Sequence, residues 1–143
     1  MFQASGKLSR ATAGGVVFDR RADGLYLYRE ARGIAETVIP GGLEVVWDGR
    51  YRISNAGPAP VTVRPGRLVM PEAFGALPTG VARRAMNAMP SFVAASGAET
   101  AANHAVVPLI APYDRFLPRF DLALADALAN GFGRPRFSRP PNE

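Results

Sequence analysis

The sequence lacks cysteine altogether, and it contains a single histidine, His104, among its 143 residues. The lack of cysteine excludes disulfide bonds, thiol nucleophiles and cysteine-ligated zinc, and it agrees with a cytoplasmic setting. One histidine cannot supply a metal-binding pair, and its position before an apolar run is typical of a surface or boundary residue. The 12 acidic residues remain as candidate acid-base groups or metal ligands, but they show no clustering that would form a site.

Long apolar stretches are also absent. No run of about 20 apolar residues could cross a bilayer, and residues 1–15 lack the apolar core of a signal peptide. The chain has no nucleophile elbow, phosphate loop or dinucleotide glycine fingerprint, and we interpret Gly41-Gly42 as a turn. We therefore expect a soluble, cytoplasmic protein without a membrane partner, and we predict no catalytic, cofactor-binding or metal-ligating residue in this chain.

Arginine, by contrast, is abundant. Lysine and arginine outnumber aspartate and glutamate by 17 to 12, which gives a net charge of +5 and a sequence pI near 10.4. A basic balance favours a polyanionic partner such as RNA. An ordinary solvated basic surface is an equal alternative, because GC-rich coding sequences also raise the arginine content.

The composition fits one ordinary domain made of short elements. Hydrophobic residues make up 48% of the chain, and 15 glycines and 13 prolines favour many defined turns. We predict an α+β fold in which small antiparallel β hairpins, as an open sheet or small barrel, precede short helices and a carboxy-terminal amphipathic helix. We expect a disordered lead over residues 1–13, a single domain over 14–133 and a disordered tail over 134–143.

Three hairpins are predicted in the first half of the chain. The first covers residues 15–28, with a polar loop over 19–24. The clearest signal is Asp48-Gly49 within residues 43–54, because both central positions of a two-residue type I′ turn need positive φ. A third hairpin is expected over residues 61–70, around a Pro-Gly turn.

The two-residue turn at Asp48-Gly49 would place Trp47 opposite Arg50, and Arg52 on the same face. If that face is open, Trp47 can stack on a base while the arginines contact phosphates. In the competing interpretation the arginine stems pack over a core tryptophan, which is the more common role of a lone tryptophan.

Helical spacing dominates the second half. A short helix is expected between Pro78 and Pro90, and Arg83 and Arg84, which lie off its apolar stripe, are further candidates for phosphate contact or simply solvated. A strand and turn are predicted over residues 91–97, and a short buried strand over 105–110. A final helix is predicted from the spacing of its apolar residues, which are Leu117, Phe120, Leu124 and Leu128.

Several stretches of the chain resemble the region after the catalytic domain in tRNA(Ile)-lysidine synthetases of the alphaproteobacterial type. They are Leu25-Tyr26-Leu27-Tyr28-Arg29-Glu30, Val38-Ile39-Pro40-Gly41-Gly42, Val46-Trp47-Asp48-Gly49-Arg50-Tyr51-Arg52-Ile53, Ala56-Gly57-Pro58-Ala59-Pro60-Val61-Thr62-Val63 and two stretches within residues 108–125. The likeness covers most of residues 14–133. It implies a parent enzyme that uses ATP and magnesium to join lysine to the wobble cytidine of an isoleucine tRNA.

The family's ATP-pyrophosphatase signature, Ser-Gly-Gly-x-Asp-Ser, has no counterpart in this sequence. The resemblance therefore implies a carboxy-terminal, tRNA-binding portion whose partners are tRNA and an amino-terminal catalytic domain that is missing here. The candidate RNA-binding residues are Arg29, Trp47, Arg50, Arg52, Arg83 and Arg84. One alternative is a structural or protein-interaction module without RNA contact, whose arginines would be matched by Glu30, Glu44 and Asp48. A second, an independent small enzyme, has no candidate set of residues.

Overall fold

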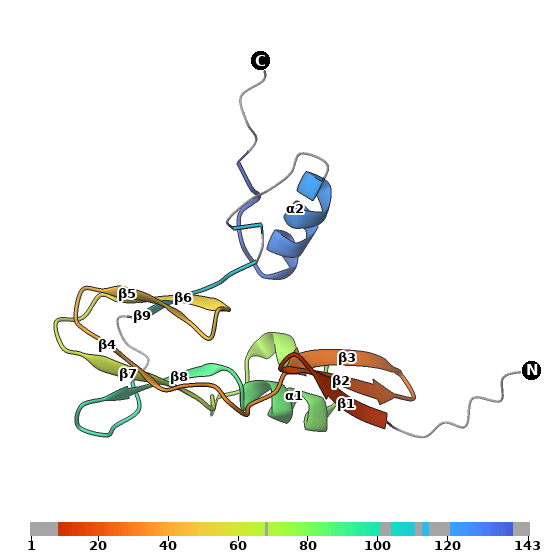
Figure 1. Ribbon diagram of the computed structural model, residues 1–143, viewed down its shortest axis with the longest axis horizontal. Coiled ribbons are helices and arrows are strands. Elements are labelled where there is room, and N and C mark those ends of the chain that lie inside the picture. The colour runs from red at the N-terminus through yellow and green to blue at the C-terminus, as the bar shows by residue number, and fades with distance from the viewer. Residues whose placement is uncertain (1–8, 68, 101–103, 111–112, 115–120, 139–143) are drawn as a thin grey trace, which may run out of the picture. The chain divides into compact units, whose positions relative to one another are not determined.

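The computed structural model describes residues 9–67, 69–100, 104–110, 113–114 and 121–138 (Figure 1). Its strands are β1 (Ser9–Ala13), β2 (Val16–Arg21), β3 (Gly24–Arg29), β4 (Thr37–Ile39), β5 (Glu44–Trp47), β6 (Tyr51–Asn55), β7 (Val61–Pro65), β8 (Pro90–Ala94) and β9 (His104–Pro108). Its helices are the 3₁₀ helix η1 (Glu72–Phe74), α1 (Thr79–Met86) and α2 (Leu122–Gly131). Three open, three-stranded sheets form, in the orders β1-β2-β3, β4-β7-β8 and β5-β6-β9. The predicted α+β class is confirmed, and the described strands form no closed barrel.

The chain divides into two compact units. The first consists of residues 1–38 and 60–102, and the second of residues 39–59 and 103–143. The first therefore holds β1 to β3, β7, β8 and α1, and the second holds β5, β6, β9 and α2. The expectation that residues 14–133 behave as a single domain stays a prediction.

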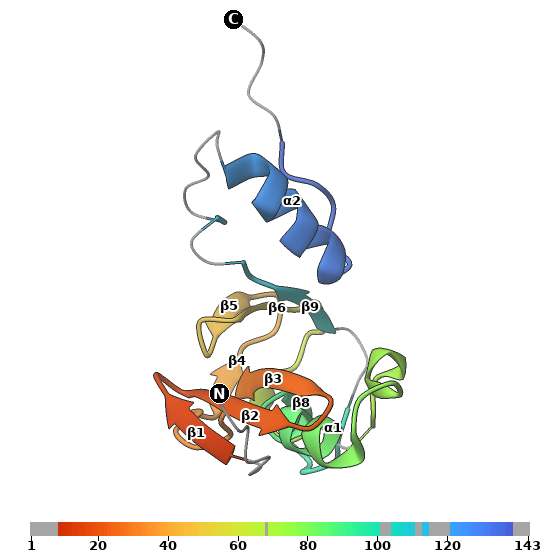
Figure 2. The ribbon, with the colours of Figure 1, turned by 90° about the vertical axis from the view of Figure 1, so that its right-hand side faces the viewer.

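In the first unit, the β1-β2-β3 sheet is built on the predicted first hairpin. Its loop is shorter than expected, because Arg21 pairs with Gly24 and Asp19 lies inside β2. β2 alternates in burial, so Val17 and Asp19 are buried while Phe18 is exposed. Helix α1 contacts β3 and lies beside this sheet (Figures 1 and 2).

Residues 9–13, which we expected to be part of a disordered lead, form strand β1. Residues 9–13 pair with β2 in antiparallel register, from Ser9 opposite Arg20 to Ala13 opposite Val16. The segment has no apolar pattern because all five residues are exposed at the edge of the sheet. The rest of the expected lead, residues 1–8, lies outside the described residues.

The prediction of a third hairpin over residues 61–70 is wrong. Strand β7 pairs with β8 in place of the expected second strand, of which Leu68 lies outside the described residues. The chain turns away at Gly66, whose φ is 114°, and the amides of Gly66 and Arg67 donate hydrogen bonds to the carbonyls of Met89 and Met86. The Pro-Gly turn thus leads to the end of α1 instead of back along β7.

In the second unit, the β5–β6 hairpin has the predicted turn but a different register. Asp48 and Gly49 have φ values of 51° and 66°, and the amide of Arg50 donates to the carbonyl of Trp47, as a type I′ turn requires. Arg50 is an additional residue after this turn, so Trp47 lies opposite Tyr51 and the predicted register is wrong by one residue. The shift places the buried Trp47 and Ile53 on one face.

Buried Asn55 ties together the loops on either side of this hairpin. Its side-chain amide donates to the carbonyls of Ile39 and Ala59, at 3.1 and 2.8 Å, and its side-chain oxygen accepts from the amide of Gly57. Gly41 packs against this loop so closely that an added Cβ would lie 2.3 Å from the carbonyl oxygen of Pro58. The turn predicted at Gly41-Gly42 is confirmed, since the amide of Leu43 donates to the carbonyl of Pro40, and the position of Gly41 in it has no room for a side chain.

The carboxy-terminal elements differ from their predicted burial. The strand predicted as buried, β9, is an edge strand beside β6, and its three central residues are exposed. Helix α2 buries Ala125 and Ala129, while Leu124 and Leu128 of the predicted stripe are exposed. The remaining positions of that stripe, Leu117 and Phe120, lie outside the described residues.

The expected disordered tail is also partly corrected. Arg134 forms two hydrogen bonds of 2.8 Å with the carboxylate of Asp114, and the amide of Phe137 donates to Asp126. Residues 134–138 are therefore attached to the second unit, and residues 139–143 lie outside the described part of the chain.

Candidate nucleic-acid interface

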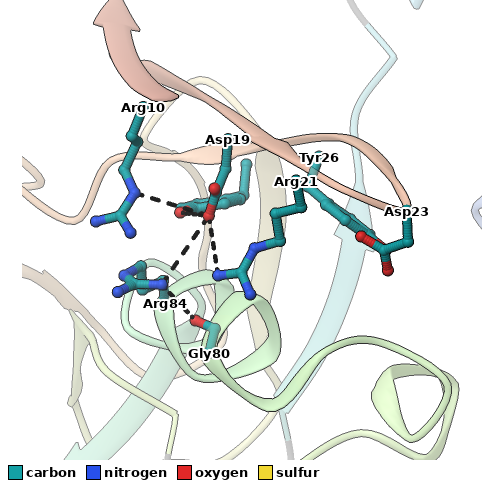
Figure 3. Close-up of polar contacts among 8 residues, drawn as sticks. Arg10, Asp19, Arg21, Asp23, Tyr26, Gly80 and Arg84 are labelled. Atoms are coloured by element: carbon teal, nitrogen blue, oxygen red, sulfur yellow. Dashed lines mark hydrogen bonds and ion pairs between the residues drawn. The ribbon is translucent and has the colours of Figure 1, made fainter. Parts of the chain in front are cut away.

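A carboxylate surrounded by arginines marks the first unit. Asp19 is 4% exposed and accepts hydrogen bonds from Arg21 at 3.2 Å and from the hydroxyl of Tyr28 at 2.9 Å. Its Oδ2 also lies 3.7 Å from Nε of Arg10 and 3.9 Å from Nη1 of Arg84. Figure 3 shows the three arginine side chains converging on this one carboxylate. The cluster thus carries more positive than negative charge.

The strand register explains why these groups meet. Arg10 of β1 lies directly opposite Asp19 of β2, so the two side chains share a face. Arg21 is two residues further along β2 and therefore also points to that face, and α1 adds Arg84. Gly80 in the first turn of α1 leaves room for this packing, since an added Cβ would lie 3.3 Å from both Arg21 and Arg84.

The surroundings of Asp19 favour its charged form. Burial raises the pKa of this carboxyl group, but hydrogen bonds from Arg21 and Tyr28, with the charges of Arg21 and Arg10, outweigh burial and lower the pKa below its usual value. Burial and the hydrogen bond to Asp19 raise the pKa of Tyr28. Tyr28 is therefore a neutral donor and Asp19 an anion at neutral pH.

A cavity of about 210 Å³ lies beside this cluster, within the first unit. Arg10, Arg29 and Arg84 line it together with Glu30. The structure thus brings together two of the sequence-predicted residues, Arg29 from β3 and Arg84 from α1. Their neighbour Arg83 is exposed on α1 and is not part of the cavity lining.

The other predicted residues lie in the second unit, where Trp47 takes the core position of the structural interpretation and not the open face of the alternative. Trp47 is 2% exposed, so its ring is part of the core and does not offer a stacking surface. Arg50 pairs with Asp48 at 2.6 Å and lies 5.0 Å from the centre of the Tyr51 ring. Arg52 lies opposite Val46 on the other face from Trp47, and its Nε is 3.2 Å from Glu44.

A further ion pair, between Asp114 and Arg134, is not predicted by the sequence. Both side chains are largely buried, and the carboxylate also accepts a hydrogen bond from the amide of Ile110. The hydrogen bonds from Arg134 lower the pKa of Asp114 despite burial, and they raise the pKa of Arg134. Twenty residues separate the partners, so no local sequence pattern marks the pair.

The described residues contain neither a candidate metal site nor a candidate membrane span. Among them, no group of three histidine, cysteine or acidic side chains could hold a metal ion. No helix in the same part of the chain is long and apolar enough to span a membrane. Basic side chains held by carboxylates are therefore the most distinctive chemical feature of the described residues.

Comparison with known proteins identifies the family. The chain is 45% identical to the tRNA(Ile)-lysidine synthase of Rhizobium meliloti (strain 1021) over 147 residues, which cover 98% of this chain and 32% of that protein. It is 34% identical to the tRNA(Ile)-lysidine synthase of Mesorhizobium japonicum over 139 residues, which cover 86% of this chain and 30% of the relative. A shorter match, 37% identical over 59 residues, is to the tRNA(Ile)-lysidine synthase of Bartonella henselae.

No family model matches the chain, and no solved structure does. The chain spans about a third of the length of the curated relatives that it matches along most of its own length. This share fits the carboxy-terminal portion expected from the resemblance. The chain belongs to the tRNA(Ile)-lysidine synthase family.

Proposed function

We propose that this chain is the tRNA-binding region of a tRNA(Ile)-lysidine synthase and acts beside a catalytic domain that lies outside this sequence. The observation that carries the proposal is the 45% identity to one such enzyme over 98% of the chain. In this proposal the parent enzyme, in the cytoplasm, uses ATP and magnesium to join lysine to the wobble cytidine. The present chain contributes affinity for tRNA and no catalytic group.

The exposure of the arginines supports contacts with the RNA backbone. Several side chains remain 40% to 49% exposed while paired with a carboxylate: Arg10, Arg52, Arg64 and Arg84. Exposed ion pairs of this kind contribute only about 0–1 kcal/mol. A phosphate group can therefore replace the carboxylate partner with only a small loss of free energy. Contacts of this kind fix the position of the protein on the RNA without reading the RNA sequence.

The alternative function, a structural or protein-interaction module, is favoured by two observations. Arg50 and Arg52 have the carboxylate partners that this alternative predicts, in Asp48 and Glu44. The outer face of the β1-β2-β3 sheet also exposes apolar side chains, namely Phe18, Leu25 and Leu27. If this alternative holds, the chain will show no salt-dependent affinity for tRNA.

A titration of the full 143-residue chain with tRNA at two salt concentrations separates the two functions. We expect the double variant Arg50→Glu and Arg52→Glu to bind more weakly and with a flatter salt dependence, because each lost phosphate contact removes part of the counterion release. The matched control is Glu44→Gln, which removes the partner of Arg52 from the same face and should leave tRNA affinity equal or higher. Unchanged affinity and slope in the double variant would remove this hairpin from the interface.

A further inference from the structure

The cavity beside Asp19 has the composition of an anion site. Arg10, Arg29 and Arg84 line it from β1, β3 and α1, and Thr12 and Asn87 add neutral polar side chains. Among the described residues that line the cavity, Glu30 is the one carboxylate, and its Oε1 lies 3.9 Å from Nε of Arg32. Three guanidinium groups against one carboxylate make the cavity positive.

Asp19 holds two of these arginines at the cavity by ionic attraction, without accepting hydrogen bonds from their guanidinium groups. Its contacts with Arg10 and Arg84 are 3.7 and 3.9 Å, which is longer than a hydrogen bond and leaves ionic attraction alone. The same carboxylate accepts its shorter contacts from Arg21 and Tyr28. Arg10 and Arg84 keep 47% and 40% of their side-chain surface exposed. Their guanidinium groups are therefore held in place but remain accessible to a ligand.

Phosphate is the anion that this arrangement fits. A guanidinium group presents a planar fork of donors that can bind two phosphate oxygens at once. Arg10 and Arg84 come from a strand and a helix, so they approach the cavity from different elements. The oxygens of a tetrahedral phosphate point in several directions, so one phosphate can accept hydrogen bonds from donors on both elements.

We propose that this cavity binds one phosphate group of the RNA backbone, with Arg10 and Arg84 as its ligands. The inference rests on the proposed function and adds to it a defined contact in the first unit. It assigns phosphate binding to Arg10, which no sequence pattern indicates. It also assigns this role to Arg84 and not to its neighbour Arg83. The hairpin that carries Arg50 and Arg52 is not part of this site.

The first test uses inorganic phosphate as the probe and the full 143-residue chain. We expect backbone amide resonances of residues around the cavity to shift during titration, and Arg10→Gln and Arg84→Gln each to weaken binding about tenfold. Arg83→Gln removes the same charge from the same helix and should bind phosphate as the wild type does. Phosphate binding that is absent in the wild type, or that Arg83→Gln weakens equally, would overturn the inference.

The second test uses tRNA with the same variants. Arg10→Gln and Arg84→Gln should each lower the magnitude of the slope of log affinity against log salt by about 0.7–0.9, the value of one phosphate contact. Binding of tRNA that is unchanged in both variants would overturn this site alone and leave the proposed function standing. A wild-type chain that binds no tRNA would overturn the proposed function itself. Far-UV circular dichroism checks that each variant is folded, which we expect because Arg10 lies on an exposed edge strand and the side chains of Arg83 and Arg84 are exposed or partly exposed on α1.

Discussion

Trp47 and Tyr51 lie directly opposite each other across the β5–β6 hairpin, with ring centres 6.2 Å apart and ring planes inclined by 32°. This pairing places Arg50 in the turn region and turns Arg52 to the opposite face. Trp47 thus belongs to the core of the second unit, the half-buried Tyr51 packs beside it, and the neighbouring charged side chains lie outside the core.

Replacing the buried tryptophan should destabilise the protein without a direct effect on RNA. We expect Trp47→Ala to lower the free energy of unfolding by about 3–5 kcal/mol, the usual cost of truncating a buried aromatic side chain. Urea denaturation followed by circular dichroism measures the loss, because the chain has no other tryptophan to report by fluorescence. An unchanged midpoint together with weaker tRNA binding would instead show that Trp47 is an exposed contact residue.

Gly41 should tolerate no side chain. An alanine Cβ would lie 2.3 Å from the carbonyl oxygen of Pro58, so the loop next to Asn55 must move, and we expect Gly41→Ala to cost about 1–3 kcal/mol, as overpacking does. Gly131 is the control, since an added Cβ at this last residue of α2 meets nothing within 4 Å. Gly131→Ala should be neutral or slightly stabilising. Equal midpoints for the two variants in thermal unfolding would contradict the close packing at Gly41.

Acid should unfold the protein in part through Asp19. The pKa of this group is lowered in the folded state, so its stabilising contribution is complete above the unfolded pKa of about 3.9 and is lost as the pH falls through the folded pKa. We expect Asp19→Asn to be less stable than wild type at pH 7 and to lose less further stability below about pH 4. Urea midpoints measured from pH 7 to pH 2.5 test this; parallel curves for the two proteins would exclude the contribution of Asp19.

The Asp114–Arg134 pair depends on the shape of the guanidinium group. Lysine keeps the charge but cannot donate the two parallel hydrogen bonds seen here, so Arg134→Lys should cost about 1.5–3 kcal/mol. The same replacement at the exposed Arg136 is the control and should change the unfolding midpoint little. If Arg134→Lys and Arg136→Lys have the same unfolding midpoint, the Asp114–Arg134 pair contributes nothing to stability beyond its charge.

The sequence predicts turns and helices better than it predicts which strands pair with one another and in which register. The Asp48-Gly49 turn and helix α1 follow from local residue chemistry, because positive φ and helix ends depend on a few neighbouring residues. The register of β5 with β6 could not be predicted, since the extra residue Arg50 is favoured by burial of Trp47 and Ile53 together. The pairing of β7 with β8 depends on contacts between segments far apart in the chain.

The candidate site was predicted only in part, for the same reason. The sequence predicts Arg29 and Arg84 as RNA contacts, but nothing local indicates that both line one cavity. It places Asp19 in a loop, because the polar residues from Asp19 to Gly24 hide the continuation of β2. Arg10 lies in a segment without apolar alternation, and its position opposite Asp19 follows only from the pairing of β1 with β2.

We propose that the arginines of this chain contact the phosphates of tRNA. The affinity of the 143-residue chain for tRNA, measured from 50 to 300 mM salt, gives the number of such contacts as the slope of log affinity against log salt. We predict a slope of about −2 or steeper, because each phosphate contact contributes about −0.7 to −0.9. A slope near zero, or no binding at the lowest salt concentration, would contradict RNA binding and favour the protein-interaction module.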